Sequence, residues 1–319
     1  MSINNEGRIT DLTNWAKHHG CTFHSVHISN HPQYGDLGIF NTKHTFASNQ
    51  DEHLAIFVPY AIIISSDVVS EEAQHDKELQ NVLNALPDTP TVEPILSVFL
   101  LYHLYLLRSG GTSKWSVYIE NLPKTSLRPI HWNQEEIVVL QLAGTSISRA
   151  ILAKLSFLKT YYDALRQVDG WFQTITWDDY LLAESWVSSR TLSCPRNDKP
   201  ILVPILDLVN HSSVRNAAWE MTLEGVELIR EPVDIPAGGE VAIAYDLDRG
   251  TGERLYRYGF IEDESYDCIS KEVVLFDVSP SRVFGGNVVR LRLEVVKGGF
   301  SDLSFLNYEN WYTLSSDRN

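Results

Sequence analysis

The spacing of apolar and polar positions changes twice along the chain. Between residues 20 and 60, short runs alternate apolar with polar side chains, as in half-buried strands. From Ser70 to about residue 190, apolar residues recur at helical spacing. After Arg190, short apolar runs return, separated by glycine and proline. The pattern predicts a β-rich domain that is split by a block of helices.

The same pattern places the individual elements. Helices are predicted over residues 12–19, 70–86, 94–107, 134–142, 147–165 and 177–187, with a short one near 254–258. Strands are predicted over residues 23–28, 39–40, 54–58, 201–206, 217–223, 226–229, 241–245 and 288–296. The most apolar helix, 94–107, is short for a membrane span and contains His103, so we expect it to be buried.

Composition narrows the classes of function. The 319 residues carry 26 Lys and Arg against 41 Asp and Glu, a net charge of −15. This balance argues against a nucleic-acid binder and favours a basic partner, although acidity can also serve solubility alone. Three distant cysteines, Cys21, Cys194 and Cys268, exclude a disulfide scaffold and indicate a reducing compartment. The polar N-terminus lacks the apolar core of a secretory signal.

Several familiar motifs are missing. The sequence has no phosphate-binding Gly-x-x-x-x-Gly-Lys loop, no Gly-x-Ser-x-Gly nucleophile motif and no Gly-x-Gly-x-x-Gly after a strand. Five histidines crowd around Cys21, but no pair of them has the spacing of zinc ligands. We therefore expect no metal site.

Two segments place polar or aromatic groups at the ends of apolar runs. The first is the apolar run 201–209, which contains Asp207 and is followed directly by Asn210 and His211. Buried polar groups of this kind need partners, and they form either a polar turn or a functional site. In the second, a strand ends at Tyr245 and a short helix leads to Tyr258-Gly259-Phe260. Aromatic residues at such positions are usually part of a core.

Taken in order, these motifs resemble the SET-domain protein methyltransferases. The resemblance is to the split class typified by the Rubisco large-subunit lysine methyltransferase and the fungal ribosomal-protein lysine methyltransferases. It also includes residues 34–40, 115–123, 140–145 and 188–190, and so spans about residues 20 to 265. The implied fold is α+β, a β-rich SET domain with a knot-like C-terminal half, interrupted by a helical insertion.

The resemblance also implies a division of the chain. Residues 1–69 would hold an N-terminal helix and the first part of the SET domain, 70–189 the insertion, and 190–277 the second part with the cofactor and catalytic motifs. Residues 278–319 would be a C-terminal extension. Longer members of the family carry a further helical substrate domain there, so this chain either lacks that domain or is truncated.

Roles for individual residues follow from the resemblance alone. The cofactor would be S-adenosylmethionine, converted to S-adenosylhomocysteine, and the residues implied to bind it are Gly35, Asp36, Leu37, Arg190, Asn210, His211 and Tyr258. The residues implied on the substrate side are Asp207, Trp219, Tyr245 and Phe260. Tyr245 would be catalytic, with its hydroxyl at the centre of methyl transfer.

The sequence departs from the family pattern at several positions. Gly250-Thr251 replaces the usual Ser-Asn, and Gly238-Gly239-Glu240 replaces the usual Gly-Glu order. Cys194 stands where a second substrate-binding arginine is expected, and Trp219 where a relative has tyrosine. These changes affect the frame of the cofactor site and the choice of substrate, while Tyr245 and the Asn-His pair are retained.

The implied function is a protein-lysine N-methyltransferase that acts on a basic non-histone protein, such as a ribosomal protein. We expect a monomer in the cytoplasm or nucleus that binds neither nucleic acid nor membrane. Two alternatives stay open, a cofactor- or protein-binding module with little catalysis, and a methyltransferase that acts on histidine.

Overall fold

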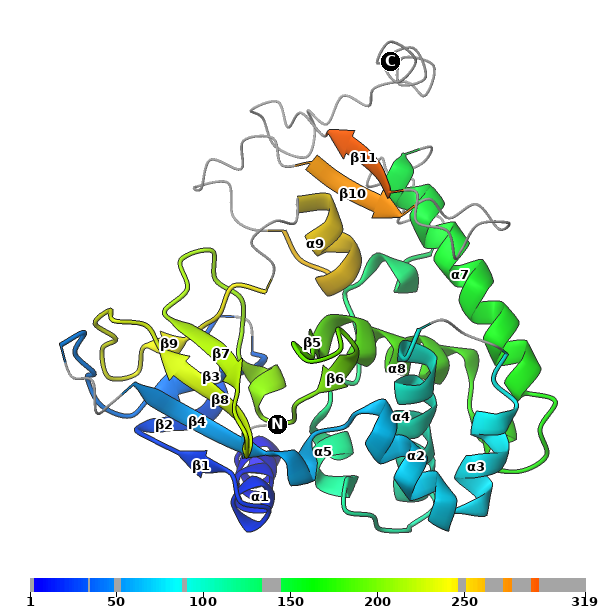
Figure 1. Cartoon of the computed structure of the whole chain (residues 1–319), viewed down its shortest axis with the longest axis horizontal. Helices are drawn as coiled ribbons and strands as arrows, with labels where there is room; N and C mark the ends of the chain where they lie inside the picture. Colours follow the sequence, from blue (N-terminus) through cyan, green and yellow to red (C-terminus); the bar gives the residue numbers. More distant parts are fainter. Residues whose placement is uncertain are drawn as a thin grey trace. The chain divides into compact units, whose positions relative to one another are not determined.

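The structure is a computed structural model, and it describes residues 3–33, 35–48, 53–87, 91–133, 145–245, 251–261, 272–276 and 288–292 (Figure 1). The chain forms two compact units. The first unit comprises residues 1–126 and 160–247, and the second comprises residues 127–159 and 248–319. The presence of both helices and antiparallel sheets confirms the predicted α+β class.

A four-stranded antiparallel sheet provides one β layer of the first unit. Its strands, in spatial order, are β1 (Thr22–Phe23), β4 (Leu54–Pro59), β8 (Gly225–Arg230) and β7 (Ala217–Met221). Ile56 lies opposite Leu228, and both are fully buried. Glu227, the residue before Leu228, is partly exposed. This alternation directs one face of the sheet into the core.

A second, three-stranded sheet consists of β2 (Val26–Asn30), β3 (Leu37–Asn41) and β9 (Glu240–Val241). Ile39 pairs with Ile28 on one side and with Val241 on the other, and all three side chains are buried. The β2–β3 hairpin therefore presents Gly35 and Asp36, two of the predicted cofactor residues, in its connecting loop at the edge of this sheet.

A buried arginine joins these two sheets. Arg230, at the end of β8, donates from Nε and Nη2 to Oδ1 of Asn41 at the end of β3, at 3.2 and 3.1 Å. It also donates to the carbonyls of Leu54 at 3.1 Å and His24 at 2.7 Å. A buried guanidinium is tolerated only when its N–H groups are satisfied. Here the satisfied groups fix the ends of β3 and β8 together.

The remainder of the first unit is largely helical. Its helices are α1 (Ile3–His18), α2 (Ser66–His75), α3 (Lys77–Asn84), α4 (Glu93–Arg108), α5 (Ser116–Asn121), α8 (Trp177–Arg190) and the end of α7 (Ser146–Leu165). The central helix, α4, is buried over most of its length and packs against α5 and α8. As predicted, it is a core helix, because it is apolar on nearly every side. Within the described residues, no helix combines the length and apolar character needed to cross a bilayer.

Three predicted elements are interrupted in the structure. The predicted strand 23–28 is divided at Ser25, whose φ of 57° lies outside the β region. The predicted helix 70–86 consists of α2 and α3, because Asp76 ends the first and caps the second by accepting from the N–H groups of Glu78 and Leu79. The predicted strand 241–245 is regular only to Val241.

Other sequence predictions hold more closely or lie outside the described residues. The N-terminal helix begins earlier than predicted, at Ile3, while α7 and α8 match their predicted ranges to within three residues. The predicted helix 134–142 falls outside the residues that the structure describes.

The second unit contains the greater part of α7, the short helix α9 (Thr251–Tyr258) and an antiparallel hairpin of β10 (Glu272–Phe276) and β11 (Val288–Arg292). Arg128 is buried and donates to the carbonyl of Tyr256 at 3.2 Å. The backbone of Gly259 approaches that of Leu127 so closely that a Cβ would lie 2.8 Å from its carbonyl carbon. This glycine therefore permits the chain to leave α9 against the 127–128 backbone.

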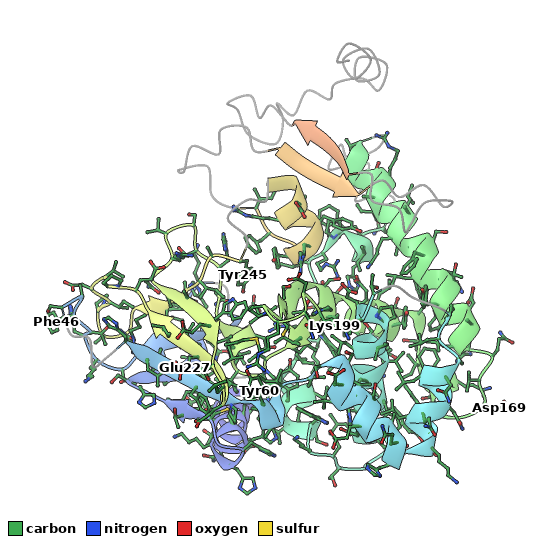
Figure 2. All side chains as sticks on the ribbon, in the orientation of Figure 1. Phe46, Tyr60, Asp169, Lys199, Glu227 and Tyr245 are labelled. Atoms are coloured by element: carbon green, nitrogen blue, oxygen red, sulfur yellow. The ribbon has the colours of Figure 1, made fainter. Side chains whose placement is uncertain are left out.

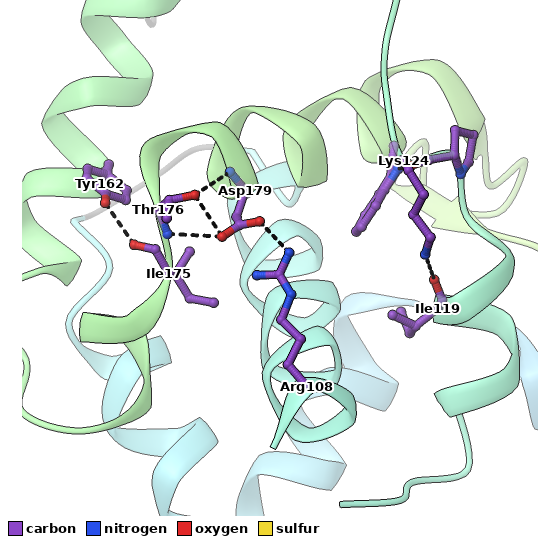
Figure 3. A network of polar contacts seen from close by, with 9 residues as sticks. Arg108, Ile119, Lys124, Tyr162, Ile175, Thr176 and Asp179 are labelled. Atoms are coloured by element: carbon purple, nitrogen blue, oxygen red, sulfur yellow. Dashed lines mark hydrogen bonds and ion pairs between the residues drawn. The ribbon is translucent and has the colours of Figure 1, made fainter. Parts of the chain in front are cut away.

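The start of α8 offers a test of how the helical part is stabilised (Figure 3). Asp179 accepts from the N–H and hydroxyl of Thr176 and from Arg108, at 2.7–3.1 Å. We expect Asp179→Ala to lower the free energy of unfolding by about 1–2 kcal/mol, because it removes both a capping box and an ion pair. Urea denaturation followed by tryptophan fluorescence measures this.

The matched control is Asp178→Ala, an exposed aspartate in the same helical turn, which should change stability by about 0.5 kcal/mol or less. Burial raises the pKa of Asp179, but hydrogen bonds from Arg108 and Thr176 lower it further than burial raises it. The carboxylate therefore stabilises the fold above that pKa, and the difference between the wild type and Asp179→Ala should shrink as the pH falls through it. Equal losses for the two variants would contradict this account.

Candidate active site

The route from Arg190 to His211 begins with a hairpin and continues through a strained turn. After α8, strands β5 (Thr191–Ser193) and β6 (Pro200–Leu202) pair, and the chain then enters a 3-10 turn at Leu206–Leu208. The predicted strand 201–206 thus ends early. Between these elements Ile205 is fully buried, with φ 75° and ψ −47°. A β-branched residue in this region is strained by about 1–3 kcal/mol, and such strain concentrates at functional sites.

The turn directs the side chain of Asp207 into a buried polar cluster. The Tyr118 hydroxyl donates to its Oδ2 at 2.9 Å. Nη1 of Arg190 lies 3.3 Å from the same oxygen and 2.8 Å from the Asp207 carbonyl. The Asp207 side chain is 1% exposed, and its Oδ1 is buried without a hydrogen-bond partner among the described residues. One carboxylate oxygen is thus held by two donors while the other is left available.

Burial and charge oppose one another in this cluster. Burial raises the pKa of Asp207, and the nearby Arg190 and Tyr118 offset only part of that rise. Burial lowers the pKa of Arg190, but the neighbouring Asp207 raises it further, so the guanidinium stays cationic. The pKa of Tyr118 is raised well above its usual value, mainly by burial, so its hydroxyl keeps the proton that it donates.

Tyr245, labelled in Figure 2, is positioned by backbone pairing between two segments that are distant in the sequence. The N–H of Ile243 donates to the Asn210 carbonyl at 3.1 Å, and the Ile243 carbonyl accepts from Ser212 at 2.9 Å. The N–H of Tyr245 then donates to Nδ1 of His211 at 3.0 Å, so this nitrogen acts as an acceptor and the imidazole is neutral. The two rings lie 5.3 Å apart.

The hydroxyl of Tyr245 is buried in a predominantly negative environment. It donates to the carbonyl of Val209 at 2.8 Å. Burial raises the pKa of Tyr245 to about 12, and the charges of Asp207, Glu240 and Asp36 add to this rise, while Arg190 opposes it. The hydroxyl is therefore protonated at neutral pH, and three carboxylates and one guanidinium act on it.

Asn210 connects this centre to the β2–β3 loop. Its Nδ2 donates to Oε1 of Glu240 at 2.7 Å and to the carbonyl of Leu37 at 3.3 Å. The second oxygen of Glu240 lies 3.4 Å from Nε2 of His31, at the base of the loop. A Cβ on Gly38 would lie 2.8 Å from Glu240 and 2.9 Å from Asn210, so only glycine permits this close packing.

The structure brings most of the predicted site residues together. Within the first unit it joins Arg190, Asp207, Asn210, His211 and Tyr245, and connects them to the loop of Gly35, Asp36 and Leu37. Gly35 adopts a φ of 78°, which suits glycine.

The remaining predicted residues lie elsewhere. Trp219 is half-buried on β7, opposite Leu228. Tyr258 and Phe260 lie in the second unit, with rings 5.9 Å apart, and their roles stay predictions. Cys194 is a buried free thiol.

Sequence reasoning did not identify Tyr118 or Glu240 as members of the site. Tyr118 is 89 residues from its partner Asp207 and lies in a short helix that reads as ordinary core. Glu240 appeared only as part of an unusual Gly-Gly-Glu order. Tyr118 lies within the segment 115–123 of the resemblance and Glu240 within the Gly-Gly-Glu order, but no local pattern assigns either one to the site, because the partners meet only in the folded chain.

The sequence is similar to proteins of known class. It is 33% identical over 181 residues to SET domain-containing protein 8 of Schizosaccharomyces pombe, covering 56% of this chain and 41% of that protein. It is 31% identical over 224 residues to the chloroplastic Rubisco large-subunit N-methyltransferase of Nicotiana tabacum, covering 65% of this chain and 43% of that protein. The chain thus spans about two fifths of the length of these relatives.

More distant similarity extends over a larger part of the chain. The ribosomal lysine N-methyltransferase set10 of S. pombe is 25% identical over 257 residues, covering 74% of this chain and 46% of that protein. An actin-histidine N-methyltransferase of Xenopus tropicalis is 24% identical over 290 residues, covering 83% of this chain and 45% of that protein. No protein-family model matches the chain.

Solved structures show the same fold. A crystal structure of the SET domain of LSMT bound to methyllysine and AdoHcy superposes with a TM-score of 0.65 at 25% identity, covering 87% of this chain and 61% of that one. The resemblance drawn from the ordered motifs is thereby confirmed. The chain has the SET-domain fold, and its sequence is similar to SET-domain proteins and protein N-methyltransferases.

Proposed function

We propose that this chain is an S-adenosylmethionine-dependent protein N-methyltransferase that acts on lysine. The observation that carries the proposal is the environment of Tyr245. Its buried hydroxyl is held by the Val209 carbonyl, and three carboxylates outnumber one guanidinium around it. Such a field favours cations, and both participants in lysine methylation, a sulfonium and an ammonium, are cationic.

The residues present fit this cofactor. When bound, S-adenosylmethionine supplies a methyl group on a positively charged sulfur, together with an ammonium group. The loop 35–37, Asn210 and His211 would hold it, with Arg190 and the carboxylate of Asp207 nearby. The buried, unpaired Oδ1 of Asp207 suits an ammonium group at this site, whether of the cofactor or of the target lysine, because it is an acceptor without a donor among the described residues.

Tyr245 orients the reaction and does not act as its base. With a pKa of about 12, only about one in ten thousand of its hydroxyls is ionised at pH 8. Because its proton is directed at Val209, its oxygen lone pairs remain able to accept weak contacts from polarised C–H groups. Alignment of this kind can lower a barrier by about 7–11 kcal/mol.

The target nitrogen must be neutral to form its new bond. The reaction forms an N–C bond, breaks an S–C bond to leave a thioether, and releases the proton of the former ammonium to water. Deprotonating a free lysine at pH 7 costs about 4–5 kcal/mol. A neighbouring sulfonium reduces that cost, because it disfavours a second positive charge.

Similarity supports lysine as the target, with histidine as the second candidate. One relative described above is named as a ribosomal lysine N-methyltransferase, and the similar solved structure holds methyllysine, whereas a more distant relative is named as an actin-histidine N-methyltransferase. The net charge of −15 suits a basic substrate such as a ribosomal protein, met in the cytoplasm or nucleus. Mass spectrometry of protein methylated in a host lysate lacking this chain distinguishes methyllysine from methylhistidine.

The proposal is tested by Tyr245→Phe, which removes the oriented oxygen and keeps the ring. Methyl transfer should fall roughly a hundredfold or more, because the contribution is made mainly in the transition state. The affinity for S-adenosylhomocysteine should change less than about threefold, because the variant keeps the ring and loses a neutral hydrogen bond to the Val209 carbonyl. Radiolabelled transfer and calorimetry measure the two quantities.

Tyr162→Phe is a matched control for this variant. The Tyr162 hydroxyl also donates to a backbone carbonyl, that of Ile175, at 2.8 Å (Figure 3). Both variants lose a similar hydrogen bond, but only Tyr245→Phe should lose activity. Wild-type turnover by Tyr245→Phe would overturn the assignment of Tyr245, and absence of transfer by the wild type into any lysate protein would overturn the proposed activity.

The acidity of the chain predicts a dependence on salt. If the carboxylates attract a lysine-rich substrate, KM for the protein should rise several-fold between 50 and 500 mM NaCl, since screening shortens the range of the field. kcat at saturating substrate should change less, because buried charges are screened weakly. Initial rates on a fixed basic substrate test this, and a KM independent of salt would argue against electrostatic docking.

A further inference from the structure

The helical insertion contributes a side chain to the site. Tyr118 on α5 is 2% exposed, and its ring stacks on Trp15 of α1 at 6.2 Å with the two planes 15° apart. The Trp15 indole is itself fixed by donating to the Lys114 carbonyl at 2.8 Å. The direction of the Tyr118 hydroxyl is thus set by packing, and it points at Oδ2 of Asp207, 2.9 Å away.

We propose that Tyr118 is a positioning residue, which holds the Asp207 carboxylate so that its other oxygen, Oδ1, accepts a hydrogen bond from an ammonium group. This inference rests on the proposed methyltransferase function. Tyr118 does not itself touch the reacting atoms, and its effect on them passes through Asp207.

If the Asp207 carboxylate served only to stabilise the fold, its unpaired Oδ1 would have no explanation. A buried ion pair such as Arg190–Asp207 is often no more stabilising than apolar side chains of similar volume. A carboxylate that served only to pair with Arg190 would be most stable with both oxygens satisfied, yet Oδ1 is buried and unpaired among the described residues. Tyr118 and Arg190 both engage Oδ2, which leaves a single acceptor in a fixed direction.

Two ammonium groups could meet this acceptor, that of the target lysine and that of the cofactor. Both are N–H donors of the same charge. A change in KM for the protein indicates the lysine, whereas a change in the affinity for S-adenosylhomocysteine indicates the cofactor.

The test is Tyr118→Phe, which retains the ring that packs on Trp15 and removes only the donor. We expect kcat/KM at neutral pH to fall roughly tenfold, the effect of losing one hydrogen bond to a charged group. The charged and titratable groups that face Asp207 are Arg190, Tyr118 and Tyr245. Loss of Tyr118's donor raises the pKa of Asp207 further, so the acidic limb of the kcat/KM profile should move up by about one pH unit.

Tyr102→Phe is the matched control, since the Tyr102 hydroxyl also donates to an aspartate, Asp76, at the start of α3. It should leave the pH profile of kcat/KM in place. In an Asp207→Asn background, Tyr118→Phe should cause little further loss, because its effect passes through that carboxylate.

A readout without cofactor or substrate is the free energy of unfolding as a function of pH. Asp207 has a folded-state pKa raised above its usual value, so its ionisation makes the fold less stable as the pH rises through that pKa. Tyr118→Phe raises it further, so the destabilisation relative to wild type should grow as the pH rises from the folded-state pKa of the wild type to that of the variant. Tyr162→Phe, which loses a hydrogen bond to the backbone carbonyl of Ile175, should give a loss that does not vary with pH.

The outcomes separate this inference from the function on which it rests. A wild type that transfers no methyl group overturns the proposed function. An active wild type with an unshifted acidic limb in Tyr118→Phe overturns the positioning role, as does an additive loss in the Asp207→Asn background. A shifted limb, a non-additive double variant and a loss of stability that grows with pH together support it.

Discussion

The candidate site depends above all on the pairing between residues 209–212 and the segment that ends at Tyr245. Ile243 both donates to and accepts from the first segment, and this joins stretches about thirty residues apart. Because the Tyr245 N–H then meets His211 and its hydroxyl meets Val209, both ends of this residue are determined by the same pairing. The side chains of Tyr245 and His211 cannot shift without disturbing hydrogen bonds to the backbone. The site is therefore rigid where the alignment of reacting groups matters most.

Around this fixed centre the chain retains groups that lower its stability. Ile205 occupies a region unfavourable for a β-branched residue, and the neighbouring Asp207 is buried although burial raises its pKa. An apolar cluster would avoid both costs. The strained backbone at Ile205 and the buried charge of Asp207 have one common explanation if the turn serves to direct the Asp207 carboxylate. The backbone conformation of the turn determines where that carboxylate points.

The parts of this arrangement that the sequence could predict are those with a local cause. Alternating apolar and polar residues predicted strand β8. Asp207 within the apolar run 201–209, and Asn210 and His211 directly after it, were recognised as buried polar groups that need partners. The break at Asp76 was not predicted, because the helical spacing of apolar residues continues across it. The boundary between α2 and α3 depends on one side chain, that of Asp76, which caps α3. Tyr118 was missed because an aromatic residue in a short helix is usually core, and it is core, with only its hydroxyl engaged in the site.

Net charge and local charge have different consequences in this molecule. The total of −15 sums over the whole chain, and at 0.1 M salt exposed charges more than about 10 Å apart are largely screened from one another. It can therefore affect how a basic partner approaches, but not the energy of a cation at Tyr245. That energy is governed by Asp207, Glu240, Asp36 and Arg190, whose balance is negative and, in part, shielded from water. A relative with neutral overall charge could retain the same chemistry if these four side chains kept their places, and an equally acidic chain without them could not.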